Sequence, residues 1–152
     1  MPVPVIFDTD IGSDIDDTWA LAFLLRCPEL DLRLLTADRG RPAYRAKLAC
    51  QILEAGERQD LPVGLGPEWD CNTGQTRQEP CAEGYELSSY AGDVIEDGVG
   101  AMIETILGSD EPVTVIAIGP LPTVAAALHR EPEIARNVGF VGMHGSLRKG
   151  HK

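Results

Sequence analysis

The sequence predicts an α/β protein with a doubly wound, mostly parallel sheet of about five strands and flanking helices, a Rossmann-like architecture. Short aliphatic and β-branched runs alternate with segments of helical periodicity, which is the pattern of βαβ units with right-handed crossovers. The length of 152 residues suits one domain. Hydrophobic residues make up 43% and charged residues 24% of the chain, so disordered and fibrous classes are excluded.

The elements can be assigned in order along the chain. Apolar runs predict strands at residues 3–7, 30–36, 61–65, 113–118 and 138–143. Apolar residues at helical spacing predict helices at residues 17–26, 43–57, 97–107 and 123–129, with a turn at 133–136. Trp19, on the first helix, is expected in the core. We expect one domain over residues 1–152, with a long polar loop at 66–93 and a flexible tail at 146–152.

The overall charge limits the classes of partner. The chain has 13 Lys and Arg against 24 Asp and Glu, a formal net charge of −11. This balance argues against nucleic-acid binding, which relies on clustered basic residues. The apolar runs are too short to span a bilayer, and the first residues lack a secretory signal pattern. Four cysteines without metal-binding spacing favour the cytoplasm; whether Cys71 and Cys81 pair stays open.

Acidic residues are concentrated between the first predicted strand and the first predicted helix, at Asp8, Asp10, Asp14, Asp16 and Asp17. Ligands of such sheets bind beyond the carboxyl ends of the strands. One or two aspartates can cap the helix, at about 1 kcal/mol each. Two carboxylates about 4 Å apart, however, repel by roughly 4 kcal/mol at an effective dielectric of about 20. Some are therefore protonated, some point to solvent, or a hard cation, Ca²⁺ or Mg²⁺, lies among them.

Two known acidic motifs can be compared with this loop. An EF-hand is excluded, because Gly12 and Ser13 occupy its fifth and sixth positions and Trp19 its twelfth. A phosphatase-like Asp-x-Asp motif, with its first aspartate as nucleophile, fits Asp8-Thr9-Asp10. Gly12, however, stands where that family usually has Thr or Val. The phosphatase-like hydrolase therefore remains as an alternative function.

The segment at 8–21, DTDIGSDIDDTWAL, resembles the opening signature of the inosine-uridine-preferring nucleoside hydrolase family. That signature is an Asp-x-Asp, a glycine turn and an Asp pair followed by x-x-Ala-Leu; here two extra residues precede the Asp pair. Later segments resemble further elements of the family in the same order: DGVG at 97–100, IAIGPL at 116–121 and FVGMHG at 140–145. Family members are roughly twice as long, so we expect a short form or one half of the fold.

The resemblance implies Ca²⁺-dependent hydrolysis of the N-glycosidic bond of ribonucleosides to free base and ribose, as in purine and pyrimidine salvage. Mg²⁺ is the second choice of ion. By position, Asp10 matches the general base and a metal ligand, Asp17 matches a metal ligand, and Pro122 falls where a backbone carbonyl contacts the metal. The remaining matches are Asp16 on a ribose hydroxyl, Met143 in the ribose pocket and Asp8 as a support of the loop.

The chain also departs from the family pattern. Arg39-Gly40-Arg41 stands where the family places Gly and Asp or Asn. An arginine there can pair with the aspartates of residues 8–17, which we call the acidic loop, in place of the metal, or it can point to solvent. His144 replaces a glycine and is interpreted as structural. The absent half carries, in the family, a further metal ligand and the acid for the leaving base. We therefore expect a complementing chain or a homo-oligomer as partner. The alternative is a catalytically inert cation-binding or assembly module.

Overall fold

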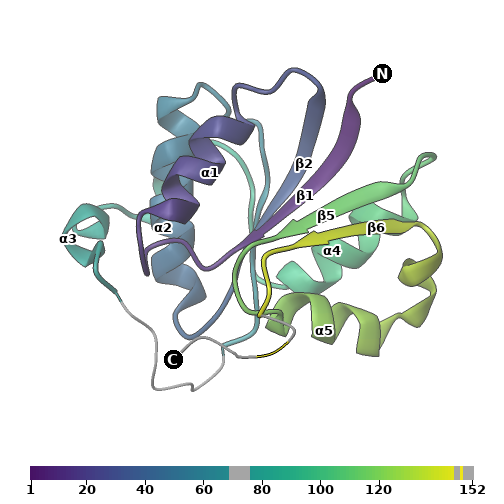
Figure 1. The fold of residues 1–152 in the computed structure, drawn as a ribbon. Coiled ribbons are helices and arrows are strands. Elements are labelled where there is room, and N and C mark those ends of the chain that lie inside the picture. Colours follow the sequence, from purple (N-terminus) through teal and green to yellow (C-terminus); the bar gives the residue numbers. More distant parts are fainter. Residues whose placement is uncertain (69–75, 146–147, 149–152) are drawn as a thin grey trace.

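The computed structural model describes residues 1–68, 76–145 and 148. Its centre is a six-stranded sheet in the order β4-β3-β2-β1-β5-β6, and every neighbouring pair is parallel (Figure 1). The chain moves outward from β1 in one direction and then returns to its other side. The strands are β1 Val3–Thr9, β2 Leu30–Ala37, β3 Val63–Leu65, β4 Val94–Ile95, β5 Val113–Ala117 and β6 Val138–Gly142.

Helices lie on both sides of this sheet. Figure 1 shows α1 (Asp16–Leu24) and α2 (Pro42–Ala55) on one side and α4 (Gly98–Leu107) and α5 (Pro122–Arg130) on the other. Each layer builds its own hydrophobic core against the strands. The remaining short helices are α3 (Glu79–Ala82), η1 (Leu87–Ser89) and η2 (Pro132–Arg136). No helix of the described residues is long and apolar enough to cross a membrane.

β1 is apolar on both faces because it lies between the two cores. Val5 and Phe7 belong to the core that includes α2, whereas Ile6 belongs to the core that includes α4 and α5. Side chains alternate along a strand, so a strand buried on both faces has an uninterrupted apolar run. Because β1 is central, the residues at its carboxyl end, from Asp8 onward, lie in the middle of the row of strand ends on that side of the sheet.

The observed elements match the predicted ones, with ends shifted by one or more residues. β4 was not expected: the sheet has a sixth strand, which is only two residues long and therefore too short to show periodicity. The predicted loop at 66–93 contains α3 and η1. Its residues 69–75, with Cys71, and most of the predicted tail at 146–152 lie outside the described residues. One domain over 1–152 stays a prediction.

Trp19 does not lie in the core, so that expectation was wrong. Its side chain is 69% exposed, and Ile15 and Phe23, four residues to either side, are exposed as well. The helix buries Leu21 and Leu24 instead. Helix α1 therefore presents an apolar stripe to its surroundings.

Candidate active site

The candidate site lies at the carboxyl end of β1. Asp8 is fully buried there, in register with Thr36 of β2 and Ala117 of β5. The Thr36 hydroxyl donates a hydrogen bond of 2.5 Å to Asp8 Oδ1. Burial is the main cause that raises the pKa of Asp8, since a low-dielectric environment disfavours the charged form. Asp8 is thus held between two strands and is inaccessible to solvent.

Asp10 follows β1 directly and is 6% exposed. Its Oδ2 accepts a hydrogen bond of 2.8 Å from Arg39 Nη1 and one of 3.3 Å from Ser13 Oγ. On the other side, a Cβ atom on Gly119 would lie 2.8 Å from Asp10 N and 2.9 Å from Asp10 Oδ1. The backbone after β5 therefore forms a wall against Asp10, which only a glycine leaves unobstructed.

Asp17 and Asp16 begin helix α1 but have different surroundings. Asp17 is 3% exposed and accepts a hydrogen bond from the Thr9 hydroxyl. Burial raises the pKa of Asp17 to about 6. Asp16 is exposed, and Asp14 is paired with Arg77 at 2.6 Å. No side chain caps the helix at its N-cap residue, so capping does not account for these aspartates.

Two buried polar residues at the same edge, Asp38 and Thr123, were missed. Asp38 follows β2 and Thr123 lies in the first turn of α5; both are fully buried. Within the described residues, both Asp38 carboxylate oxygens, Asp8 Oδ2 and Thr123 Oγ1 have no hydrogen-bond partner. A Cβ on Gly66 would lie 2.5 Å from Thr123 Oγ1 and 3.0 Å from Asp38 Cβ. Asp38 lies two residues after the predicted strand at 30–36, so its position beyond a strand end was a usable signal.

The Asp38 carboxyl is unsuited to carrying a charge. Burial, followed by the nearby Asp8 carboxylate, raises its pKa. Like charges that share a site disfavour ionisation, and burial acts in the same direction. The edge therefore contains four buried carboxyl groups, on Asp8, Asp10, Asp17 and Asp38, which we call the acidic cluster.

Arg45 of α2 holds the backbone around the acidic cluster. Its side chain is nearly fully buried, with 1% of the residue exposed. Its Nη1 donates to the carbonyls of Asp10 and Ile11, the latter at 2.8 Å, and its Nε donates to the Arg39 carbonyl at 2.8 Å. This residue was also missed, although it precedes Leu48 by three positions and so lies on the apolar face of the predicted helix.

The other predicted residues lie at the same sheet edge. Pro122 begins α5, next to Thr123. Met143 follows β6 and is 62% exposed, and its N–H donates to the Ala117 carbonyl at 3.1 Å. His144 stacks on Phe140, with ring centroids 5.6 Å apart. β6 is the second strand from β1 in the sheet, so Met143, which follows it, lies two strands away from the end of β1.

The chemistry of the acidic cluster fits a hard divalent cation. Its donors are carboxylate and hydroxyl oxygens, the ligands that Ca²⁺ and Mg²⁺ prefer, and several of these buried oxygens lack a partner in the described part of the chain. In their present arrangement, no three carboxylate, His or Cys side chains of the described residues form a ligand set. The Asp10 carboxylate is paired with the Arg39 guanidinium.

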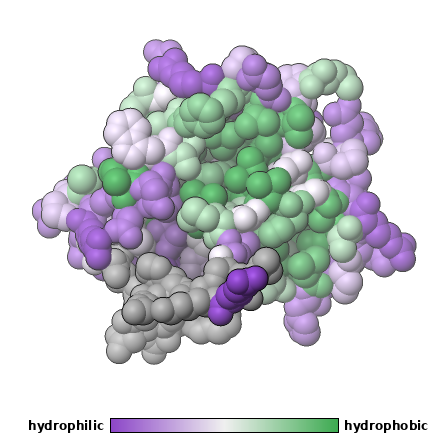
Figure 2. Space-filling view, in the orientation of Figure 1, coloured by the Kyte–Doolittle hydropathy of each residue, from purple (hydrophilic) through white to green (hydrophobic). Residues whose placement is uncertain are grey.

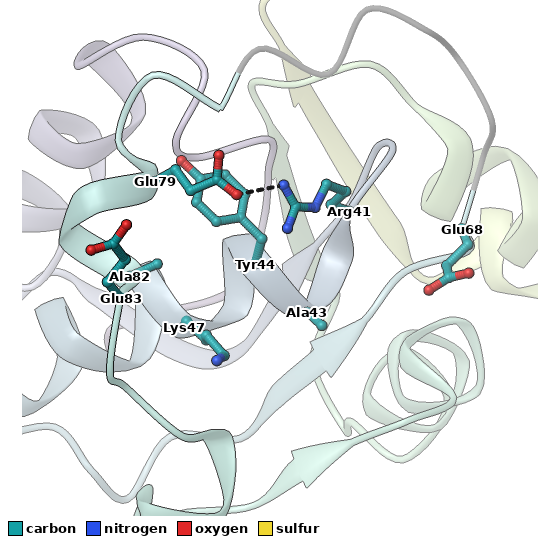
Figure 3. Close-up of a pocket in the computed structure, with 8 residues that line it drawn as sticks. All are labelled: Arg41, Ala43, Tyr44, Lys47, Glu68, Glu79, Ala82 and Glu83. Atoms are coloured by element: carbon teal, nitrogen blue, oxygen red, sulfur yellow. Dashed lines mark hydrogen bonds and ion pairs between the residues drawn. The ribbon is translucent and has the colours of Figure 1, made fainter.

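A separate pocket of about 340 Å³ lies beside α2 and α3 (Figure 3). Tyr44 lines it and donates a hydrogen bond of 3.1 Å to the Gly12 carbonyl, so the pocket adjoins the outside of the acidic loop. Across it, Arg41 pairs with Glu79 at 2.8 Å, and both side chains are about half exposed. No residue of the acidic cluster lines the pocket. Paired, solvated charges do not indicate a ligand, so the acidic cluster is the stronger candidate.

The fold and the position of the site define the class of protein. The connection that leaves β1 leads to β2, whereas the connection that leaves the neighbouring β5 leads in the opposite direction, to β6. The carboxyl ends of β1 and β5 therefore form a topological switch point, where ligands of doubly wound α/β proteins bind. A sequence model of the inosine-uridine preferring nucleoside hydrolases matches residues 5–151. The chain belongs to this family, which confirms the resemblance seen at the acidic loop.

Individual relatives agree with this assignment. The chain is 31% identical to a non-specific ribonucleoside hydrolase, RihC, of Klebsiella pneumoniae, over 99% of its own length and 52% of the relative's. A plant nucleoside hydrolase structure is 28% identical, with a TM-score of 0.77 over 96% of this chain and 49% of the plant chain. A structure from Bacillus anthracis, 19% identical with a TM-score of 0.79, shares the fold. The chain spans about half the length of the relatives it matches.

Proposed function

We propose that this chain supplies the acidic part of a nucleoside hydrolase site, which cleaves ribonucleosides to free base and ribose. The observation that carries this proposal is the acidic cluster, buried at the switch point of a chain of this family. The Klebsiella relative is named a non-specific ribonucleoside hydrolase, which supports ribonucleosides as the substrate class.

In this proposal Asp10 is the general base. A carboxylate within hydrogen-bond reach of a water molecule can remove its proton as the water attacks the sugar. Asp10 suits this role because it directly follows the central strand and its carboxylate accepts hydrogen bonds from Ser13 and Arg39. The Asp17 carboxyl, whose pKa is raised to about 6, is ionised at neutral pH and also favours the positive charge that develops on the ribose in an oxocarbenium-like transition state.

The remaining roles follow from position. Asp16 is exposed at the start of α1, where it can accept a hydrogen bond from a ribose hydroxyl, and the exposed Met143 can line the ribose pocket. Asp8, held by Thr36, supports the loop. Asp10, Asp17 and the Pro122 carbonyl would hold Ca²⁺, with Mg²⁺ as the second choice. When bound, such an ion lowers the pKa of a bound water and orients the sugar.

The phosphatase-like alternative is disfavoured by the position of Asp8. That mechanism needs the first aspartate of the motif as a nucleophile that reaches the substrate. Asp8 is fully buried, and its Oδ1 is engaged by Thr36. A catalytically inert cation-binding module remains the second candidate, because the chain matches only about half of its relatives' length.

One assay tests the proposed activity. The chain is purified in complex with the part of the Klebsiella relative that it does not match. The complex is incubated with inosine or uridine, in the presence of Ca²⁺ or a chelator, and free ribose is measured. We expect Ca²⁺-dependent ribose release that is lost in Asp10→Ala and kept in Asp14→Ala, a matched control in the same loop whose side chain is 60% exposed. A Ca²⁺-dependent rise in melting temperature without ribose release would instead favour the inert module.

The site also requires a partner in this proposal. We propose a complementing polypeptide, equivalent to the part of the relatives that this chain does not match, in preference to a homo-oligomer. Figure 2 shows that apolar surface gathers over β1, β5 and β6, between α1 and α5. Val141 and Met143 at the β6 edge are 57% and 62% exposed. Apolar patches of this kind mark interaction surfaces.

A further inference from the structure

We propose that Arg39 is a built-in counter-ion of Asp10, which a divalent cation must displace before it can bind the acidic cluster. The inference rests on the proposed cation site and adds a residue that sets the affinity of that site. In this inference, the Arg39 guanidinium and an added divalent cation compete for the Asp10 carboxylate.

The first support is the ion pair itself. Arg39 Nη1 lies 2.8 Å from Asp10 Oδ2, and the two side chains are 27% and 9% exposed. Coulombic interactions are much stronger in such a partly buried position than in water. Asp10 is also the residue to which the family resemblance assigns both the metal and the proton. The guanidinium therefore engages the oxygen that the cation would need.

The second support is the backbone conformation at Arg39, which places its side chain beside Asp10. Arg39 has a φ of 62°, and Gly40 follows with a φ of 70°. A left-handed conformation is unfavourable for a residue with a Cβ atom, so other contacts must stabilise it. The Arg39 carbonyl accepts hydrogen bonds of 2.8 Å from both Arg45 Nε and the Arg41 N–H. Because Arg45 is buried, this turn is anchored to α2.

The third support is the division of labour between the two arginines. Arg45 directs its guanidinium to backbone carbonyls and to the Ser13 hydroxyl, whereas Arg39 forms an ion pair with a carboxylate of the cluster. A divalent ion bound at Asp10 would meet the guanidinium at close range, and like charges repel strongly there. The partial exposure of Arg39 leaves it a path to solvent, so the ion can replace it.

The test is a Ca²⁺ titration of the chelator-treated chain by calorimetry. We compare the unmodified chain with Arg39→Gln, which removes the charge, and with Arg39→Lys, which keeps it. Arg77→Gln is the matched control, because it removes an arginine that pairs with the exposed Asp14 of the same loop. We expect Arg39→Gln to bind Ca²⁺ at least about tenfold more tightly, whereas the other two variants stay close to the unmodified chain.

A second readout follows thermal unfolding. Without divalent ions, Arg39→Gln should melt below the unmodified chain, because Asp10 loses its counter-ion, and added Ca²⁺ should raise its melting temperature more. Equal Ca²⁺ affinities of Arg39→Gln and the unmodified chain would overturn the inference while leaving the proposed cation site intact. No Ca²⁺ binding by any variant would overturn both the cation site and the counter-ion.

Discussion

At the scale of single residues, Gly119 is where the backbone after β5 comes closest to Asp10. In Gly119→Ala the new Cβ would lie within 2.9 Å of Asp10 N and Oδ1, closer than real contacts allow. We expect a loss of about 1–3 kcal/mol in the free energy of unfolding, together with displacement of the Asp10 carboxylate. Urea unfolding measures the first effect, and Ca²⁺ titration measures the second.

Gly139→Ala is the matched control for this prediction. Its Cβ would meet no atom closer than 3.4 Å, the Thr114 Oγ1, which is an ordinary contact. Gly139 also lies in a strand, where replacing glycine by alanine does not by itself destabilise the folded backbone. Similar stability of the two variants would contradict the close approach of Gly119 to Asp10.

The buried carboxyls of the acidic cluster make stability depend on pH. Burial raises the pKa of Asp17 from 3.8 to about 6 and also raises that of Asp38. Between the unfolded and folded pKa values the folded chain binds more protons, so the free energy of unfolding falls as pH rises. With chelator present, we expect it to fall by about 2 kcal/mol or more from pH 5 to pH 8.

Asp38→Asn separates this effect from other sources of pH dependence. The amide has the same shape as the carboxyl group but does not ionise. The decrease in stability between pH 5 and pH 8, measured by urea unfolding, should therefore be smaller in this variant. An increase in stability over the same pH range in the unmodified chain would contradict the proposed effect of burial.

From residue spacing alone, the site was predictable only where its residues are close in sequence, whereas Pro122 and Met143 were predicted from the family resemblance. Asp8, Asp10 and Asp17 stand out because five aspartates are crowded into one loop. Asp38 and Thr123 join them only through the order of the strands, which brings the ends of β2 and β5 to the two sides of β1. That order is a tertiary property that local periodicity does not contain.

At the scale of elements, α4 depends on a residue that is polar, exposed and easily removed. Asp97 accepts a hydrogen bond of 2.9 Å from the Gly100 N–H and pairs with Arg130 at 2.6 Å. Asp97→Ala leaves the first turn of the helix without this acceptor, which costs about 1 kcal/mol. Urea unfolding at neutral pH measures the loss.

Arg130→Ala is the control, because it removes the ion pair and keeps the cap. Both side chains of the pair are more than half exposed, and such surface pairs contribute about 0–1 kcal/mol. We therefore expect a smaller loss than in Asp97→Ala. Equal losses would assign the stabilisation to the ion pair instead of the cap.

The elements also show where periodicity stops being informative. α1 has apolar residues around most of its circumference, so spacing alone does not determine which side is buried. The structure buries Leu21 and Leu24 together with Asp17 and leaves Trp19 and Phe23 exposed. The polar Asp17 lies on the buried side because it belongs to the acidic cluster. Hydrophobic spacing therefore leaves the orientation of α1 open, and the buried position of Asp17 in the acidic cluster is part of what the sequence pattern does not indicate.

At the scale of the whole molecule, the sheet is well covered except near β6. A pocket of about 410 Å³ with an apolar lining lies between α5 and β6 and includes Val138 and Phe140. Val141 is in register with Ile116 and lies on the opposite face of β6 from Phe140, where its exposed side chain adds further apolar surface. A stable interface buries roughly 1,200–2,000 Å², and an apolar sheet edge is a suitable site for one.

The last prediction therefore concerns assembly. When the chain is coexpressed with the part of the Klebsiella relative that it does not match, we expect a one-to-one complex by light scattering after size exclusion. Val141→Asp should weaken the complex, because it places a charge in the apolar surface. Leu107→Asp, on another exposed apolar side chain, at the end of α4, should leave the complex intact. If the chain alone forms a dimer that Val141→Asp dissociates, the same surface joins two copies, and the complementing polypeptide is ruled out in favour of a homo-oligomer.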